Sequence, residues 1–120
     1  MLTHTIPISV DKQQVLDFAN ITGDNISIHI LDGVVQGGLI IGLLPHWFKT
    51  AKDDGNFNQK YFAGMTVKMD CKFKNPLFAN TEVNITFSYK PLKLKMSQIN
   101  WTIHDTKEYC SGIWIVSSLS

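Results

Sequence analysis

The second half of the chain alternates apolar and polar positions with a period of two, which is typical of half-buried β-strands. The apolar members of two such runs are Val67, Met69, Cys71 and Phe73, and then Val83, Ile85, Phe87 and Tyr89. Lysines, aspartate, glutamate and other polar residues occupy the alternate positions, and Asn75-Pro76 separates the two runs. We therefore predict two strands that each have one buried and one solvated face.

Further strands follow, with less regular patterns. Leu92, Leu94 and Met96 share one parity, whereas Ile99, Trp101 and Ile103 share the other. A β-bulge near Ser97-Gln98 would reconcile the two parities. After a turn at residues 105–107, the stretch from Tyr109 to Val116 is apolar on both parities, which predicts a strand covered on both faces.

The first half of the chain has helical spacing instead. Apolar residues between Asp11 and Ile21 predict a short packing helix, with Asp11 as its N-cap and Gly23 as its terminator. The segment from Gly37 to Phe48 is apolar nearly all round, which suits a helix wrapped by a sheet. Pro45 predicts a kink or a break in that helix, and residues 49–58 are expected to form a loop.

These elements predict one α+β domain over residues 1–120, in which an antiparallel sheet curls around a long central helix. A helix that is apolar on every side needs more cover than one small sheet offers. We therefore expect a homodimer in which two sheets run edge to edge.

Composition and charge narrow the possible functions. The 120 residues carry a formal net charge of +1, and all eleven cationic residues are lysine, which excludes nucleic-acid binding as the default function. The longest apolar run is far below the roughly 18 residues of a membrane span, and no signal peptide is evident, so we expect a cytoplasmic protein. We find no motif for a metal or a cofactor and expect none.

The candidate chemistry lies between the two helical segments. Asp24 and His29 are five residues apart, and Gly37-Gly38 begins the central helix. An acid and a base on one short loop can share a water molecule, and the amides of a helix N-terminus can hold a developing oxyanion. The alternative interpretation is that Asp24 is a turn residue and His29 a packing residue.

This segment resembles the hydratase motif of the MaoC-like family, which includes the (R)-specific enoyl-CoA hydratases. The residues that match in order and spacing are Phe18, Ile21, Thr22, Gly23, Asp24, Ile28 and His29. Val35-Gln36-Gly37-Gly38 is similar to the family's Val-His-Gly-Met at the start of its central helix. The later Phe73-Lys74-Asn75-Pro76-Leu77 also resembles the family's pattern after that helix.

The resemblance implies a hotdog fold and reversible hydration of a trans-2-enoyl thioester, or dehydration of an (R)-3-hydroxyacyl thioester. It implies that Asp24 and His29 are the catalytic pair, and that Gly37 and Gly38 bind the thioester carbonyl. The acyl group of the substrate would be carried by coenzyme A or by an acyl-carrier protein. The lysines at positions 68, 72 and 74 could bind the phosphates of coenzyme A or the acidic surface of a carrier protein.

Two other functions remain open within the same fold. Ile26 and Gln36 stand where the family has Asn and His, which favours a catalytically degenerate acyl-binding or scaffolding subunit. A hotdog thioesterase, or a carrier-protein dehydratase, often places a carboxylate on the central helix. Residues 37–50 contain none, so the hydratase interpretation ranks first.

Overall fold

The computed structural model describes residues 2–23, 26–55 and 64–118, which form five strands and three helices. The strands are β1 (Leu2–Ile8), β2 (Gly64–Phe73), β3 (Val83–Pro91), β4 (Met96–His104) and β5 (Glu108–Ser118). The helices are α1 (Lys12–Thr22), α2 (Ser27–Ile30) and α3 (Gly37–Gly55). The strands form one sheet in the order β1-β3-β4-β5-β2, and all neighbours are antiparallel.

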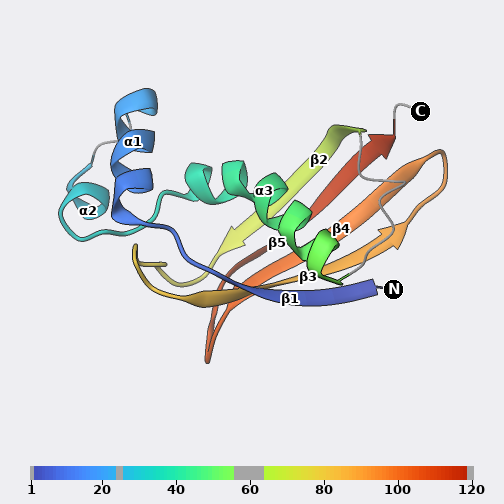
Figure 1. Cartoon of the computed structure of the whole chain (residues 1–120). Helices are drawn as coiled ribbons and strands as arrows, with labels where there is room; N and C mark the ends of the chain where they lie inside the picture. Colours follow the sequence, from blue (N-terminus) through green and yellow to red (C-terminus); the bar gives the residue numbers. More distant parts are fainter. Residues whose placement is uncertain (1, 24–25, 56–63, 119–120) are drawn as a thin grey trace.

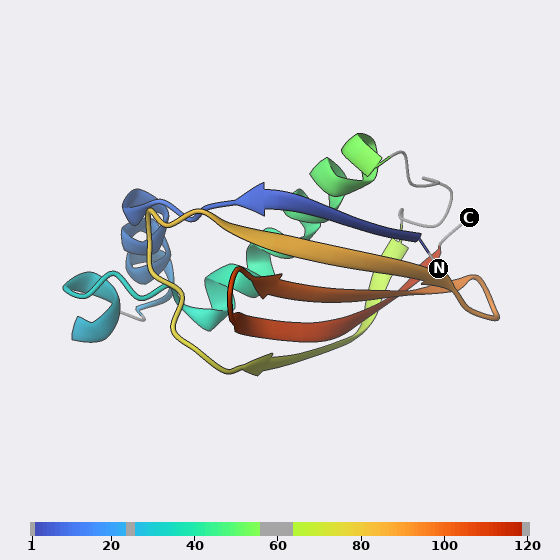
Figure 2. The same ribbon diagram turned by 90° about the horizontal axis from the view of Figure 1, so that it is seen from below.

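The long helix α3 lies across one face of this sheet, and α1 and α2 lie together beyond one end of it (Figure 1). Seen from below, β1 and β2 form the two edges of the sheet (Figure 2). The predicted α+β architecture, an antiparallel sheet packed on a long central helix, is therefore confirmed. No helix in the described ranges is both long and apolar enough to span a membrane.

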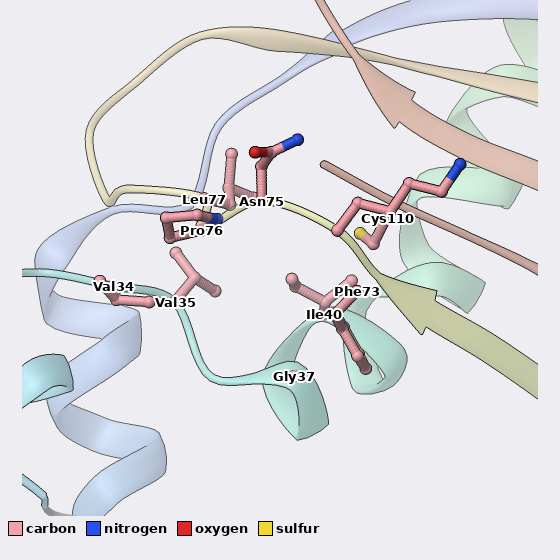
Figure 3. A pocket seen from close by; sticks show the side chains of 10 residues that line it. Val34, Val35, Gly37, Ile40, Phe73, Asn75, Pro76, Leu77 and Cys110 are labelled. Atoms are coloured by element: carbon pink, nitrogen blue, oxygen red, sulfur yellow. The ribbon is translucent and has the colours of Figure 1, made fainter. Parts of the chain in front are cut away.

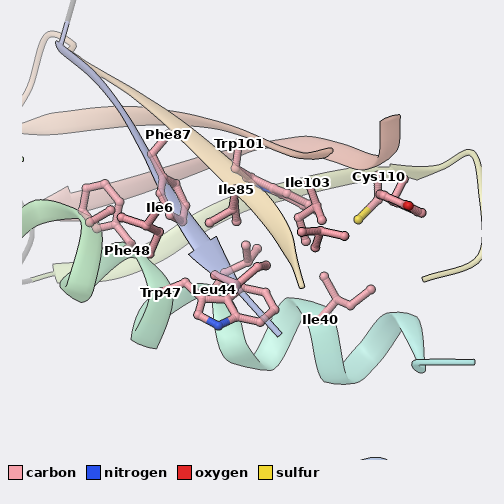
Figure 4. Packing of buried hydrophobic residues seen from close by; sticks show 14 of the residues in the cluster. Ile6, Ile40, Leu44, Trp47, Phe48, Ile85, Phe87, Trp101, Ile103 and Cys110 are labelled. Atoms are coloured by element: carbon pink, nitrogen blue, oxygen red, sulfur yellow. The ribbon is translucent and has the colours of Figure 1, made fainter. Parts of the chain in front are cut away.

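The core lies between α3 and the inner face of the sheet (Figure 4). From α3, Leu44 and Phe48 are almost completely buried. The Phe48 ring meets Phe87 of β3 edge to face, with ring centroids 5.2 Å apart, and Trp114 of β5 at 6.1 Å. These aromatic side chains fill the space beneath the middle of α3.

The predicted boundaries of α1 are confirmed. The Asp11 carboxylate accepts a hydrogen bond from the Gln14 backbone amide, and the Gln14 side chain accepts one from the Asp11 backbone amide. These two bonds form a capping box. Gly23 ends the helix in the left-handed region, at φ 76°, where a glycine avoids the steric cost of a Cβ.

Two expectations for the central helix are wrong, the break at Pro45 and the loop at residues 49–55, while a kink at Pro45 stays a prediction. Pro45 does not break α3, which runs on to Gly55, so residues 49–55 are helical rather than a loop; residues 56–58 of the expected loop lie outside the described part. Pro45 is on the exposed side of the helix, while Trp47, Phe48 and Ala51 are buried on the other side. Their burial offsets the loss of one backbone hydrogen bond.

The predicted bulge near Ser97-Gln98 is also wrong. β3 and β4 pair without a register shift at these residues, and the change of parity comes from a tight turn between the two strands. Leu94 and Lys95 occupy the left-handed region in this turn, at φ 59° and 58°. A turn of this kind reverses the chain and so resets the parity of the next strand.

The two outer parts of the sheet differ from expectation as well. The apolar face of β2 was predicted to be buried, but Val67 and Phe73 on it are 55% and 52% exposed. β2 is an edge strand of the sheet, so this face is only partly covered. Ile113 and Ile115 on the outer face of β5 are only partly buried, so β5 is covered on one face. The edge strand β1, which contains Pro7, was not predicted.

Candidate functional site

The imidazole of His29 is held in place by its own loop. His29 lies on the single turn of α2, and its Nδ1 is 2.7 Å from the carbonyl oxygen of Val34. Its backbone amide donates to Ile26, and its carbonyl accepts from the Lys12 ammonium at 3.3 Å. The side chain is half-buried, so the ring is oriented without being sealed from solvent.

This hydrogen bond decides the tautomer of the neutral ring. A backbone carbonyl can only accept, so Nδ1 carries the proton and donates it to Val34. The basic lone pair is then on Nε2. A histidine whose Nδ1 is fixed in this way is suited to take a proton at Nε2.

Asp24, the residue expected to act with His29, lies outside the described residues. The structure therefore leaves the predicted pair of Asp24 and His29 as a prediction.

The N-terminus of α3 is fixed by a short ladder to the β2–β3 loop. The Val35 amide donates to the Leu77 carbonyl at 2.8 Å, and the Ala79 amide donates to the Gly33 carbonyl at 2.7 Å. Within the described residues, the amides of Gly37 and Gly38 have no backbone acceptor. Such amides at the positive end of a 19-residue helix can bind an anion or a carbonyl oxygen.

The two glycines have different neighbours. A Cβ built on Gly37 would lie 2.8 Å from the Phe73 ring, whereas a Cβ on Gly38 would lie 2.9 Å from the Phe18 ring of α1. A Cβ at either position would therefore force an aromatic ring to shift. Gly37 faces β2, and Gly38 faces α1.

Gln36, which stands where the resembled family has histidine, is completely buried. Its Nε2 donates to the Val15 carbonyl at 3.0 Å. The side chain thus ties the start of α3 to α1.

A cavity of about 340 Å³ adjoins Gly37 (Figure 3). Its walls come from the segment before α3, the first turns of α3, the end of β2 with the following loop, and β5. The lining residues are Val34, Val35, Gly37, Ile40, Phe73, Lys74, Asn75, Pro76, Leu77 and Cys110. The lining is mostly apolar, and its one charged side chain is that of Lys74.

The polar side chains that line the cavity are either paired with Glu108 or uncharged. Lys74 forms an ion pair with Glu108 at 2.6 Å, and Asn75 donates to the Glu108 carbonyl at 2.7 Å. Burial raises the pKa of the Cys110 thiol to about 12, with smaller contributions from Cys71 and Glu108. The thiol is therefore an apolar part of the wall at neutral pH, and not a nucleophile.

Two of the predicted site residues are connected to the cavity. Gly37 lines the cavity, and His29 is joined by its hydrogen bond to Val34, which also lines it. Gly38 and His29 are not themselves lining residues. Sequence reasoning gave no role to Phe73 or Cys110, although the alternation of β2 had placed Phe73 on the same face as the core.

No cluster of three His, Cys, Asp or Glu side chains suited to a metal ion occurs in the described part of the chain.

Comparison with known proteins supports the architecture. No protein-family model and no curated protein sequence matches the chain. Among solved structures, an (R)-hydratase from A. caviae involved in PHA biosynthesis superimposes with a TM-score of 0.72 at 16% identity, covering 97% of this chain and 93% of that one. The unliganded (R)-hydratase of Pseudomonas aeruginosa gives a TM-score of 0.65 at 12% identity, covering 98% and 81%.

Thioesterases share the same architecture. A 1,4-dihydroxy-2-naphthoyl-CoA thioesterase from Synechocystis superimposes with a TM-score of 0.69 at 10% identity, covering 98% of this chain and 84% of that one. At these identities the likeness establishes the fold. The chain therefore has the hotdog fold that its resemblance to the MaoC-like hydratases implied, and it shares this fold with solved hydratases and thioesterases.

Proposed function

We propose that this protein catalyses the reversible addition of water to a trans-2-enoyl thioester, giving a 3-hydroxyacyl thioester. The observation that carries the proposal is the hydrogen bond between His29 Nδ1 and the Val34 carbonyl, at 2.7 Å. It orients the basic nitrogen of His29, eight residues before the helix N-terminus at Gly37, by a bond to a residue three positions before that N-terminus. A base bonded to one lining residue of the cavity, and a helix N-terminal amide on another, support a reaction that needs both.

The Gly37 amide is the proposed donor to the thioester carbonyl. Charge develops on this oxygen when the substrate passes through an enolate, and the positive end of α3 favours that charge. A preorganised donor of this kind contributes roughly 3–4 kcal/mol to lowering a barrier. Polarisation of the carbonyl also makes the β-carbon electrophilic.

His29 and Asp24 are the proposed water-activating pair. His29 Nε2 takes a proton from water while the oxygen bonds to the β-carbon, and the electrons of the double bond move toward the carbonyl. The α-carbon then receives the proton that His29 took, and Asp24 supports this delivery, so both side chains end in their starting state. The net result is one water added and no other product. General acid–base catalysis of this type contributes about 10²–10⁴-fold in rate.

A homodimer is part of the proposal. Met65 and Val67 of the edge strand β2 are 60% and 55% exposed, and an edge strand with exposed apolar residues invites pairing with another chain. Pairing through β2 would join two sheets edge to edge.

The proposal is tested by following two products from crotonyl-CoA. Loss of the conjugated double bond reports hydration, and appearance of the free thiol of coenzyme A reports hydrolysis. We expect hydration without thiol release, and we expect Asp24→Asn to reduce it by about 10²-fold or more. Thiol release in place of hydration would contradict the proposal.

The thioesterase neighbours make hydrolysis the second candidate function. Hydrolysis would use the same Gly37 amide but would attack the carbonyl carbon instead of the β-carbon. A third result, binding of acyl thioesters with neither product, would indicate the degenerate acyl-binding subunit.

A further inference from the structure

We propose that the cavity beside Gly37 holds the acyl chain and that Phe73 sets the length of chain it accepts. This inference rests on the proposed function, because it assigns a substrate class, thioesters of short to medium acyl chains, to the same site. Two observations support it. Phe73 packs against Gly37, and Phe73 is half exposed whereas most of the other apolar walls are buried.

Most apolar walls of the cavity are fixed by the core. Ile40, Leu77 and Cys110 are at most 4% exposed, and Val35 is held by its hydrogen bond to Leu77. Side chains packed to core density have no room to move aside for a ligand. These walls therefore define a cavity of constant shape.

Phe73 differs from them because it is 52% exposed. It is the last residue of the edge strand β2 and the largest apolar side chain of the lining. Its ring has solvent on one side and the cavity on the other, so it can be replaced or moved without disturbing the core. Figure 3 shows Phe73 beside Ile40 and Gly37 at the start of α3.

The same ring lies against Gly37. Three of its carbons lie 2.8–3.3 Å from the place where a Cβ of Gly37 would be. A carbonyl oxygen bound to the Gly37 amide would therefore lie near the ring, and the attached chain would run along it into the cavity. The ring is thus placed to limit how much chain follows the thioester.

The volume of the cavity indicates the length of chain. A cavity of roughly 150 Å³ holds benzene, which corresponds to about 25 Å³ per carbon. By this measure a cavity of about 340 Å³ holds about 14 non-hydrogen atoms. The carbon, oxygen and sulfur of the thioester, the α- and β-carbons and the 3-hydroxyl oxygen account for about six of these atoms, so about eight further chain carbons remain.

The lining is suited to an aliphatic chain. Its one charged group, the Lys74 ammonium, is already paired with Glu108 at 2.6 Å, and the Cys110 thiol is neutral. A polar ligand would find few partners beyond Asn75. An apolar chain gains by leaving water, because each buried methylene is worth about 0.8 kcal/mol.

The test measures binding of alkyl-CoA thioethers by titration calorimetry. S-butyl-, S-octyl- and S-dodecyl-CoA lack the carbonyl group and the double bond, so neither hydration nor hydrolysis can consume them. The variants are Phe73→Ala, which enlarges the cavity, and Phe73→Trp, which reduces it. Phe78→Ala is the matched control, since Phe78 lies in the loop that follows β2, is 47% exposed and does not line the cavity.

We expect the natural chain to bind S-octyl-CoA more tightly than S-butyl-CoA and to gain nothing from S-dodecyl-CoA. Phe73→Ala should bind S-dodecyl-CoA about tenfold more tightly, since about two further buried methylenes account for such a gain. Phe73→Trp should lose the preference for the octyl chain. Phe78→Ala should preserve the original ranking.

An unchanged ranking in Phe73→Ala, or the same change in Phe78→Ala, would overturn the inference. So would alkyl chains that add nothing to the affinity for coenzyme A itself. The molar mass of each variant in solution separates an effect on the cavity from an effect on chain association. If the alkyl preference shifts as expected but crotonyl-CoA is not hydrated, the inference stands and the proposed function fails.

Discussion

At the scale of single residues, the carboxylate of Asp105 organises the turn between β4 and β5. It accepts hydrogen bonds from the Tyr109 hydroxyl at 2.7 Å and from the Lys107 amide at 3.1 Å. These bonds, that of Tyr109 foremost, hold the pKa of Asp105 below its ordinary value. Its contribution to stability is therefore complete above the ordinary pKa and is lost as the pH falls through the lowered one.

We predict that Tyr109→Phe raises the pKa of Asp105 toward its ordinary value, because the largest cause of the shift is removed. Carboxyl chemical shifts followed through a pH titration measure this. Tyr89→Phe is the control, since Tyr89 bonds to Ser97 and not to Asp105. An Asp105 pKa that is the same in Tyr109→Phe as in the natural chain would contradict the assignment.

The Cys110 thiol gives a second prediction at this scale. Burial raises its pKa to about 12, so its thiolate is scarce at pH 8. In the Cys71→Ser variant, which leaves Cys110 as the sole thiol, a thiol reagent should react far more slowly with the native protein than with the urea-unfolded protein. Equal rates in the two states would show that Cys110 is accessible.

Residue identity predicted some of these details but not others. Asp11 and Gly23 were predicted as caps because capping depends on residue type. The acceptor for His29 could not be predicted, because it is the backbone carbonyl of Val34, and every residue carries such a group. The role of Gln36 was also hidden, since its partner is the Val15 carbonyl.

At the scale of elements, the β3–β4 turn places two residues with side chains in the left-handed region. Leu94 and Lys95 have φ values of 59° and 58°, and this conformation costs roughly 1–2 kcal/mol for each residue that is not glycine. Asn-Gly is the preferred pair for a turn with two left-handed residues.

We therefore predict that the double substitution Leu94→Asn with Lys95→Gly stabilises the protein by about 1–2 kcal/mol. The measurement is the free energy of unfolding in urea. Lys93→Gly is the control, because Lys93 does not have a positive φ and glycine there should only add freedom to the unfolded chain. A loss of stability in the double variant would contradict the turn geometry.

The elements themselves were predicted where periodicity was strong, as in β3 and α1. The length of α3 was not, because residues 49–55 are mostly polar and helical only through the burial of Ala51 and Lys52. The edge strand β1 was missed because Pro7 interrupts its pattern, although an edge tolerates proline.

At the scale of the whole molecule, we predict that association depends on β2. Val67→Lys places a charge among exposed apolar residues of this edge and should convert a dimer to a monomer, as measured by the molar mass from light scattering. Leu94→Lys is the control, because Leu94 is 85% exposed in the β3–β4 turn rather than on β2. A dimer that persists in Val67→Lys would place the interface elsewhere.

The candidate site belongs to this scale as well. Its cavity combines residues from before α3, from the end of β2 and from β5, so no local pattern in the sequence could reveal it. The resemblance at Gly23 to His29 indicated the region, but the packing of Phe73 on Gly37 depends on the pairing of distant strands.

The most direct measurement is the rate of crotonyl-CoA hydration by His29→Gln compared with His46→Gln. A glutamine at position 29 can still donate to the Val34 carbonyl but cannot act as a base, while His46 is an exposed histidine on α3. We predict that His29→Gln lowers kcat by about 10²–10⁴-fold, with the melting temperature preserved, and that His46→Gln retains full activity. Equal activity in the two variants would contradict the account.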